Sequence, residues 1–113
     1  MHRLLLVAML GAAATACGQP AGGSTDGAAV FGSVCAACHG PTGKPDATMV
    51  ARLGVKDLTD PALRPTLTAA HVEMQVRRGS ANKLMPALEG ALTDAQIKAV
   101  AAYVASPAFA PAR

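Results

Sequence analysis

The pentapeptide Cys35-Ala36-Ala37-Cys38-His39 constrains this chain more than any other feature of its sequence. Two thiols at this spacing can reach two vinyl groups of one porphyrin, and the adjacent imidazole then lies beneath the iron. The pattern therefore predicts one covalently attached haem c. Cys35 and Cys38 are the expected attachment points, and His39 is the expected axial ligand.

Three other interpretations of the motif stay open at this point. A redox dithiol normally lies in a βαβ unit. The chain shows no strand pattern of that kind, because no stretch alternates β-branched residues with period two. Half of a zinc site needs a second Cys/His pair, which is missing, since His2 and Cys17 both lie in the N-terminal segment. A structural disulfide between Cys35 and Cys38 would leave His39 unexplained.

The composition supports a cofactor at the centre of the fold. The chain has 113 residues, which favours a single domain with a thin core. It has no Trp, one Tyr and two Phe, although aromatic side chains normally supply the largest buried areas. A porphyrin would fill the space that these side chains leave.

The first 16 residues are typical of a secretory signal peptide. A short positive start is followed by an apolar run over residues 4–10 and by small residues ending in Ala14-Thr15-Ala16. The apolar run is shorter than the roughly 20 residues that a membrane-spanning helix needs. We therefore expect residues 1–16 to be removed and the protein to be exported to the periplasm.

Cys17 follows the signal directly and is left over once the motif has used the other two cysteines. Its position resembles that of the lipidated cysteine of bacterial lipoproteins. Residues 18–25 are mostly Gly, Ser, Gln and Pro, which is typical of a flexible tether. We expect residues 17–25 to anchor the domain to a membrane. Cleavage that leaves a free thiol at Cys17 is the alternative.

Capping signals predict two clear helices in an all-α chain. Thr93 and Gln96 form a capping box that opens a helix with an apolar stripe, and Pro107 ends it. Thr68 opens another helix, which Gly79 is expected to close in the left-handed conformation.

Shorter helices are expected elsewhere. One runs from Asp46 to Leu53 and ends at Gly54, and one or two turns start at Asp60-Pro61. At the front, Ser24 or Thr25 is expected to cap a helix that carries Val30, Phe31 and Val34 and runs into Cys35.

The sixth ligand of the iron has four candidates: Met49, Met74, Met85 and His71. Met85 is favoured because it lies in an irregular segment between Gly79 and Pro86, and the proline fixes the backbone beside the thioether. Met74 lies mid-helix, where methionine usually fills gaps. His71 lies in the first turn of the same helix and is expected to be exposed.

Residues 26–106 resemble a bacterial class I c-type cytochrome. The resemblance rests on Phe31 upstream of the motif and Gly40, on Met85-Pro86, on Leu92-Thr93 and on residues 100–104. It implies a cytochrome c-like fold of three to five helices around one haem, with His39 and Met85 as axial ligands. It also implies that Gly27 and Phe31 cross the last helix at Tyr103, and that Pro41 or Pro45 accepts the His39 ring N–H. We expect residues 107–113 to form a C-terminal tail.

With both axial positions filled, the predicted function is single-electron carriage rather than catalysis, since no acid/base pair stands near the motif. The expected partners are a dehydrogenase, an oxidase or another cytochrome. We expect the protein itself to be a monomer. Lys44, Arg77, Arg78 and Lys83 could steer acidic partners. The alternatives are a peroxidase-like haem enzyme and a haem-based redox or gas sensor, each with a displaceable Met85.

The net charge of the chain is small and does not identify a class of partner. The formal charge of +3 falls to +2 when the signal segment takes Arg3 with it. No basic run of the nucleic-acid-binding kind occurs, so no nucleic-acid partner is expected.

Overall fold

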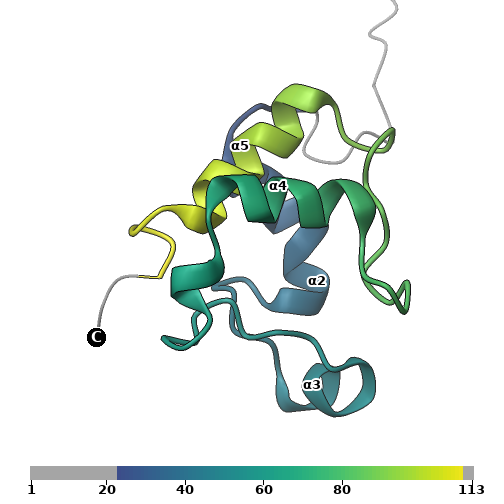
Figure 1. Ribbon diagram of the computed structural model, residues 1–113, viewed down its shortest axis with the longest axis vertical. Helices are drawn as coiled ribbons and strands as arrows, with labels where there is room; N and C mark the ends of the chain where they lie inside the picture. The colour runs from purple at the N-terminus through teal and green to yellow at the C-terminus, as the bar shows by residue number, and fades with distance from the viewer. Residues whose placement is uncertain (1–22, 111–113) are drawn as a thin grey trace, which may run out of the picture.

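The computed structural model describes residues 23–110, and these form an all-α fold (Figure 1). Its elements are α1 (Gly27–Val30), η2 (Phe31–Cys35), α2 (Ala36–His39), α3 (Ala47–Leu53), η3 (Arg64–Thr66), α4 (Ala69–Arg78) and α5 (Asp94–Ala105). Within this range the β-structure amounts to one isolated bridge between Glu89 and Leu92. The predicted fold class is confirmed. No helix of residues 23–110 has the length and apolar character needed to cross a membrane.

Side-chain caps begin three of the helices where the sequence predicts them. The Asp46 carboxylate accepts the Met49 N–H at 2.8 Å, and the Thr68 hydroxyl accepts the His71 N–H at 3.2 Å. Before α5, Thr93 and Gln96 exchange two hydrogen bonds of 3.1 and 3.0 Å, which is a complete capping box. These starts are predictable because each cap acts within four residues of chain.

The front helix differs from the prediction in two ways. Its cap is Asp26, whose carboxylate accepts the Ala28 N–H, while Ser24 accepts the N–H of Asp26 itself. It is also not regular, because the Ala36 N–H bonds to the carbonyl of Phe31 five residues back. This wider π-turn lets α1 continue through η2 into the cysteine motif.

Glycines end two of the helices, α3 and α4. Gly54 closes α3 in the left-handed conformation, as expected. Gly79 ends α4 with a positive φ of +71°, as expected, but its ψ of −172° lies outside the left-handed helical region. The chain leaves α4 extended because Gly79 packs against the returning segment: a Cβ there would lie 2.5 Å from the Met85 carbonyl oxygen and 2.7 Å from the Ala87 nitrogen.

The core lies where α5 packs against α4 and α1 (Figure 1). Each element contributes small or branched apolar side chains from one face. The buried apolar residues are Val30, Phe31, Val72, Val76, Leu92, Ile97, Val100, Ala101, Val104 and Phe109.

The expected crossing of the first and last helices is confirmed. Phe31 and Tyr103 meet edge to face with their ring centroids 5.9 Å apart. A Cβ on Gly27 would overlap the Ala99 carbonyl oxygen and lie 2.6 Å from the Tyr103 Cβ. The two backbones therefore approach more closely than any residue other than glycine permits.

Phe109, beyond the predicted end of the domain at residue 106, is part of this core. Its ring meets those of Phe31 and Tyr103 at centroid distances of 5.1 and 5.2 Å. The Arg64 guanidinium lies 5.4 Å from the Phe109 centroid and donates to the carbonyls of Val104 at 2.6 Å and Ser106 at 3.1 Å. A cation at the C-terminal end of α5 satisfies carbonyls that the helix leaves unpaired.

Substitution of Gly27 tests the helix crossing. Gly27→Ala should lower the free energy of unfolding of the haem-loaded protein by about 1–3 kcal/mol, because the added methyl group forces α1 away from α5. Gly32→Ala is the matched control, since a Cβ there meets no atom within 4 Å. It should leave stability unchanged or raise it by about 0.4–1 kcal/mol. Equal losses in denaturant titrations of the two variants would contradict the close crossing.

Candidate functional site

The cysteine motif forms one continuous helical segment. Cys35 ends η2, and α2 carries Cys38 and His39. Both thiols are free; Cys35 is half-buried against the core and Cys38 is exposed. Because residues three apart in a helix are neighbours, the two sulfur-bearing side chains lie on the same side of the segment.

The electrostatics of Cys35 do not suit a redox dithiol. Burial, with a smaller effect of the neighbouring Cys38, raises the pKa of the Cys35 thiol to about 11. A reactive dithiol depends on the opposite shift, towards a thiolate at neutral pH. Nor does the described part of the chain gather three or more His, Cys, Asp or Glu residues that could hold a bare metal ion.

The His39 ring is held in one orientation and one tautomer. Its Nδ1 lies 3.1 Å from the carbonyl oxygen of Lys56. Since a carbonyl can only accept, the proton is on Nδ1, and Nε2 keeps its lone pair. Burial lowers the pKa of His39, an effect that the bond to Lys56 partly opposes, so the imidazole is neutral at pH 7.

The carbonyl that orients His39 corrects one expectation. Neither Pro41 nor Pro45 accepts its ring N–H; Lys56 does, 17 residues along the chain. The chain turns at Gly40, which has φ +79°, and passes through α3 before it returns. The Leu58 N–H then bonds to the Gly43 carbonyl at 2.9 Å, which brings Lys56 beside the imidazole.

This donor set fits a covalently bound haem. It offers two free thiols on one side of a helical segment and a neutral imidazole whose Nε2 is available to a metal. A backbone carbonyl on the other ring nitrogen is the usual way in which proteins fix a ligating histidine.

Hydrogen bonds between residues 80 and 85 hold the segment that carries Met85 in one conformation. The Ser80 N–H donates to the Met85 carbonyl and the Met85 N–H to the Ser80 hydroxyl, each at 3.0 Å. The Asn82 side chain accepts from the Ser80 hydroxyl at 2.6 Å and from the Leu84 N–H at 3.0 Å. Lys83, at the tip, is the one described non-glycine residue with a positive φ, 61°. Met85 itself is half-buried against the core.

The other candidate ligands lie in different surroundings. Met74 is 44% exposed on α4, two residues from each of the buried Val72 and Val76, and so on the opposite side of that helix. His71 is exposed in the first turn of α4. Met49 lies on α3, on the stretch of chain between His39 and Lys56.

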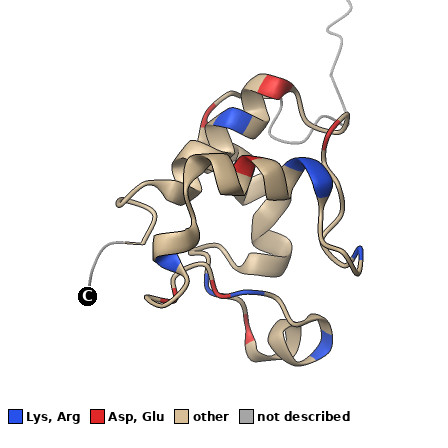
Figure 2. Ribbon diagram, in the orientation of Figure 1, with Lys and Arg blue, Asp and Glu red and all other residues tan. Residues whose placement is uncertain are grey.

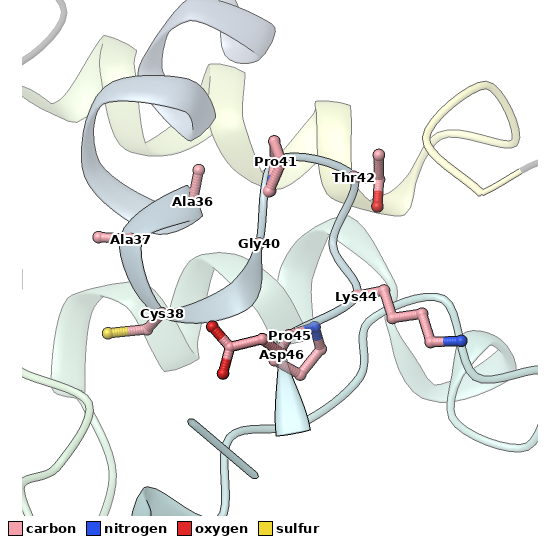
Figure 3. A pocket seen from close by; sticks show the side chains of 9 residues that line it. All are labelled: Ala36, Ala37, Cys38, Gly40, Pro41, Thr42, Lys44, Pro45 and Asp46. Carbon is pink, nitrogen blue, oxygen red and sulfur yellow. The ribbon is translucent and has the colours of Figure 1, made fainter. Parts of the chain in front are cut away.

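A hollow of about 410 Å³ lies between α2 and the loop that follows it (Figure 3). Most of its lining consists of small side chains, with Lys44 and Asp46 as the charged members. The Asp46 carboxylate is engaged as the cap of α3, and Lys44 extends away from Cys38. The hollow therefore offers no free acid and base side by side.

Sequence reasoning missed Lys56, Ser80 and Asn82 as supports of the site. A backbone carbonyl such as that of Lys56 leaves no mark in the sequence. Ser80 and Asn82 did carry a signal, because Ser and Asn favour turns that bond their side chains to nearby backbone N–H groups.

Comparisons with known proteins agree with this geometry. Residues 23–104 match the family model described as cytochrome c oxidase, cbb3-type, subunit III. The solved structure of the KustC0563 c-type cytochrome is similar to this one, with a TM-score of 0.64. The sequences are 24% identical, and the similarity covers 75% of this chain and 98% of that one. No curated protein sequence matches the chain.

The fold, the cysteine motif and the family match agree, and the family implies covalently bound haem c and haem-based electron transfer. The chain belongs to the c-type cytochrome family described as cytochrome c oxidase, cbb3-type, subunit III.

Proposed function

We propose that this chain is an exported single-electron carrier with one haem c attached at Cys35 and Cys38, and with His39 and Met85 as axial ligands. The observation that carries the proposal is the Met85 segment, in which both backbone polar groups of Met85 bond to Ser80. Haem iron, when bound, supplies a centre that gains and loses one electron. The protein's part is to hold both ligands still.

The two proposed ligands are held by separate local devices. The Lys56 carbonyl fixes the His39 ring, and the Ser80–Asn82 turn fixes the backbone of Met85. Gly79 lets the two ends of the Met85 segment approach closely. Ligands fixed in this way change little between oxidation states. A methionine–histidine pair also raises the reduction potential.

The same observation weighs against the enzymatic and sensor alternatives. A peroxidase-like enzyme or a gas sensor needs Met85 to leave the iron. Because the bonds to Ser80 hold the backbone of Met85, its thioether could leave only by rotation of the side chain. A peroxidase also needs polar groups that move protons at the open position. The side chains that form hydrogen bonds within the Met85 segment, Ser80 and Asn82, are neither acids nor bases.

The charge distribution refines the proposed partner surface. Of the four cations expected to steer partners, Arg77 is engaged by Glu73 at 2.9 Å, by Glu89 at 3.4 Å and by Asp94. The bonds to Glu73 and Asp94 raise the pKa of Arg77, and the bond to Arg77 lowers the pKa of Asp94. Figure 2 shows this cluster where the end of α4 meets the start of α5, with a separate basic residue in the loop after α4.

Lys44, Arg78 and Lys83 remain exposed, and we propose that they meet an acidic surface on a dehydrogenase, an oxidase or another cytochrome. The family description names an oxidase subunit, so an oxidase is the first partner to test. We propose that the chain meets it as a monomer.

The proposed location rests on the order of segments in the sequence. The signal of residues 1–16 and the lipidated Cys17 lie outside the described residues. The tether joins the domain beside α5, where the Gln96 side chain donates to the Ser24 carbonyl at 3.1 Å. We propose that the domain is held in the periplasm at the end of a lipid-anchored tether.

Covalent attachment is tested by removing the two thiols. Cys35→Ser/Cys38→Ser should abolish the haem that stays with the polypeptide during denaturing electrophoresis, because no thioether can form. Cys17→Ser is the matched control and should keep it. If acidified organic solvent extracts the haem from the wild-type protein, the attachment is not covalent.

The sixth ligand is tested by comparing two methionines. The oxidised wild-type protein should show the weak sulfur-to-iron band in the far red, and Met85→Ala should abolish it and lower the reduction potential. Met74→Ala should leave both unchanged, since Met74 lies on the exposed side of α4. A far-red band that survives in Met85→Ala would assign the ligand elsewhere.

The anchor is tested by fractionation of cells. The wild-type protein should sediment with membranes and begin at an acylated Cys17. Cys17→Ser should release it into the periplasmic fraction with its haem spectrum unchanged. Mass spectrometry that finds an unmodified N-terminus on the wild-type chain would establish a soluble protein instead.

A further inference from the structure

Arg64, the first residue of η3, is a half-buried cation whose partners are all neutral. Its guanidinium donates to the backbone carbonyls of Val104 at 2.6 Å and Ser106 at 3.1 Å, where α5 ends. It also donates to the Leu58 carbonyl at 3.4 Å and lies 5.4 Å from the centroid of the Phe109 ring. None of the ion pairs in the described part of the chain includes it. The guanidinium therefore acts through the directions of its hydrogen bonds, which its planar fork of N–H groups fixes.

The Leu58 carbonyl belongs to the segment that orients His39, the proposed axial ligand. Lys56 accepts the His39 ring N–H at 3.1 Å, and two residues later the Leu58 N–H donates to the Gly43 carbonyl at 2.9 Å. The carbonyl of Leu58 then accepts from Arg64. This segment is therefore held at three points: at the ring that it orients, at the loop after the cysteine motif and at the guanidinium.

Phe109 connects the same loop to the end of the fold. A Cβ on Gly43 would overlap the Cζ atom of Phe109, so the backbone of the loop rests directly on this ring. The Phe109 N–H donates to the Ser106 carbonyl at 3.0 Å, and Arg64 donates to that same carbonyl. The Phe109 ring and the guanidinium therefore form one unit, which joins the end of α5 to the two segments that the bond between Leu58 and Gly43 holds together.

We infer that Arg64 is a positioning residue for the axial ligand His39. Through Leu58 it fixes where the Lys56 carbonyl meets the imidazole. The inference rests on the proposed ligation of the haem iron by His39. A firm hydrogen bond on Nδ1 makes Nε2 a more basic ligand and keeps the ring from turning. Hydrogen bonds around the ligands are one of the means by which a protein sets the potential of a bound haem. In this role Arg64 links the C-terminal end of the fold to the reduction potential of the site.

Nuclear magnetic resonance of the reduced, haem-loaded protein tests this role. The resonance of the His39 Nδ1 proton reports its hydrogen bond, because a shorter bond moves the resonance downfield. Arg64→Gln should move this resonance upfield, since the Lys56 carbonyl is then no longer held in place. Val100→Ala is the matched control: it removes buried methyl groups from α5 and lowers stability, but should leave the resonance unchanged. Equal shifts in the two variants, or no shift in Arg64→Gln, would overturn the inference.

The reduction potential gives a second readout at constant charge. Arg64→Lys keeps the positive charge, but an ammonium group cannot reproduce the planar fork or its stacking on Phe109. The weaker bond on His39 makes the imidazole less basic, so the oxidised state loses stabilisation and the potential should rise. Arg77→Lys, the same change in the ion-pair cluster between α4 and α5, should leave the potential unchanged. A potential in Arg64→Lys equal to that of the wild type would also overturn the inference.

The carbon-bound ring protons of His39 in the same spectra report the proposed ligation separately. On a haem-bound imidazole the ring current of the porphyrin moves these protons far upfield. If they lack this shift in the wild-type protein, the proposed ligation fails and the inference fails with it. If they keep it while Arg64→Gln leaves the Nδ1 resonance unchanged, the ligation stands and only the role of Arg64 is wrong.

Discussion

The close approach of α1 to α5 at Gly27 fixes the position of everything that follows it in the chain. The backbones meet where only glycine fits, and the rings of Phe31, Tyr103 and Phe109 lock the crossing from one side. Because α1 continues through the π-turn into the motif, the crossing also sets where Cys35 lies. A domain of this size has a small hydrophobic core, so a few closely packed contacts largely determine how its helices are arranged.

Beyond that crossing, the site is assembled from loops held by local hydrogen bonds. The Lys56 carbonyl orients His39, Leu58 bonds to Gly43, and the turn at Ser80 fixes Met85. The ion-pair cluster of Arg77 joins the end of α4 to the segment that leads into α5. Exposed ion pairs of this kind contribute little individually, so the cluster defines geometry more than it adds stability.

Much of this arrangement could be predicted from the sequence, for a physical reason. The caps at Asp46, Thr68 and Thr93 each act within one helical turn, and the cysteine motif is a local pattern. The rest depends on contacts between distant segments. Three adjacent residues before α1 can each cap a helix, and only the packing selects Asp26. The carbonyl of Lys56 has no side-chain signature. Phe109 joins the core through contacts with Phe31 and Tyr103, where Arg64 also bonds to the end of α5.

In the function that we propose, both axial positions of the haem are closed, as a carrier of single electrons requires. Carbon monoxide binds reduced haem only where a position is open or its ligand leaves easily. The reduced wild-type protein at neutral pH, with its Met85 segment pinned at Ser80, should therefore keep its visible spectrum unchanged when carbon monoxide is added. Rapid formation of the carbon monoxide complex would contradict the closed site and favour a haem enzyme or sensor.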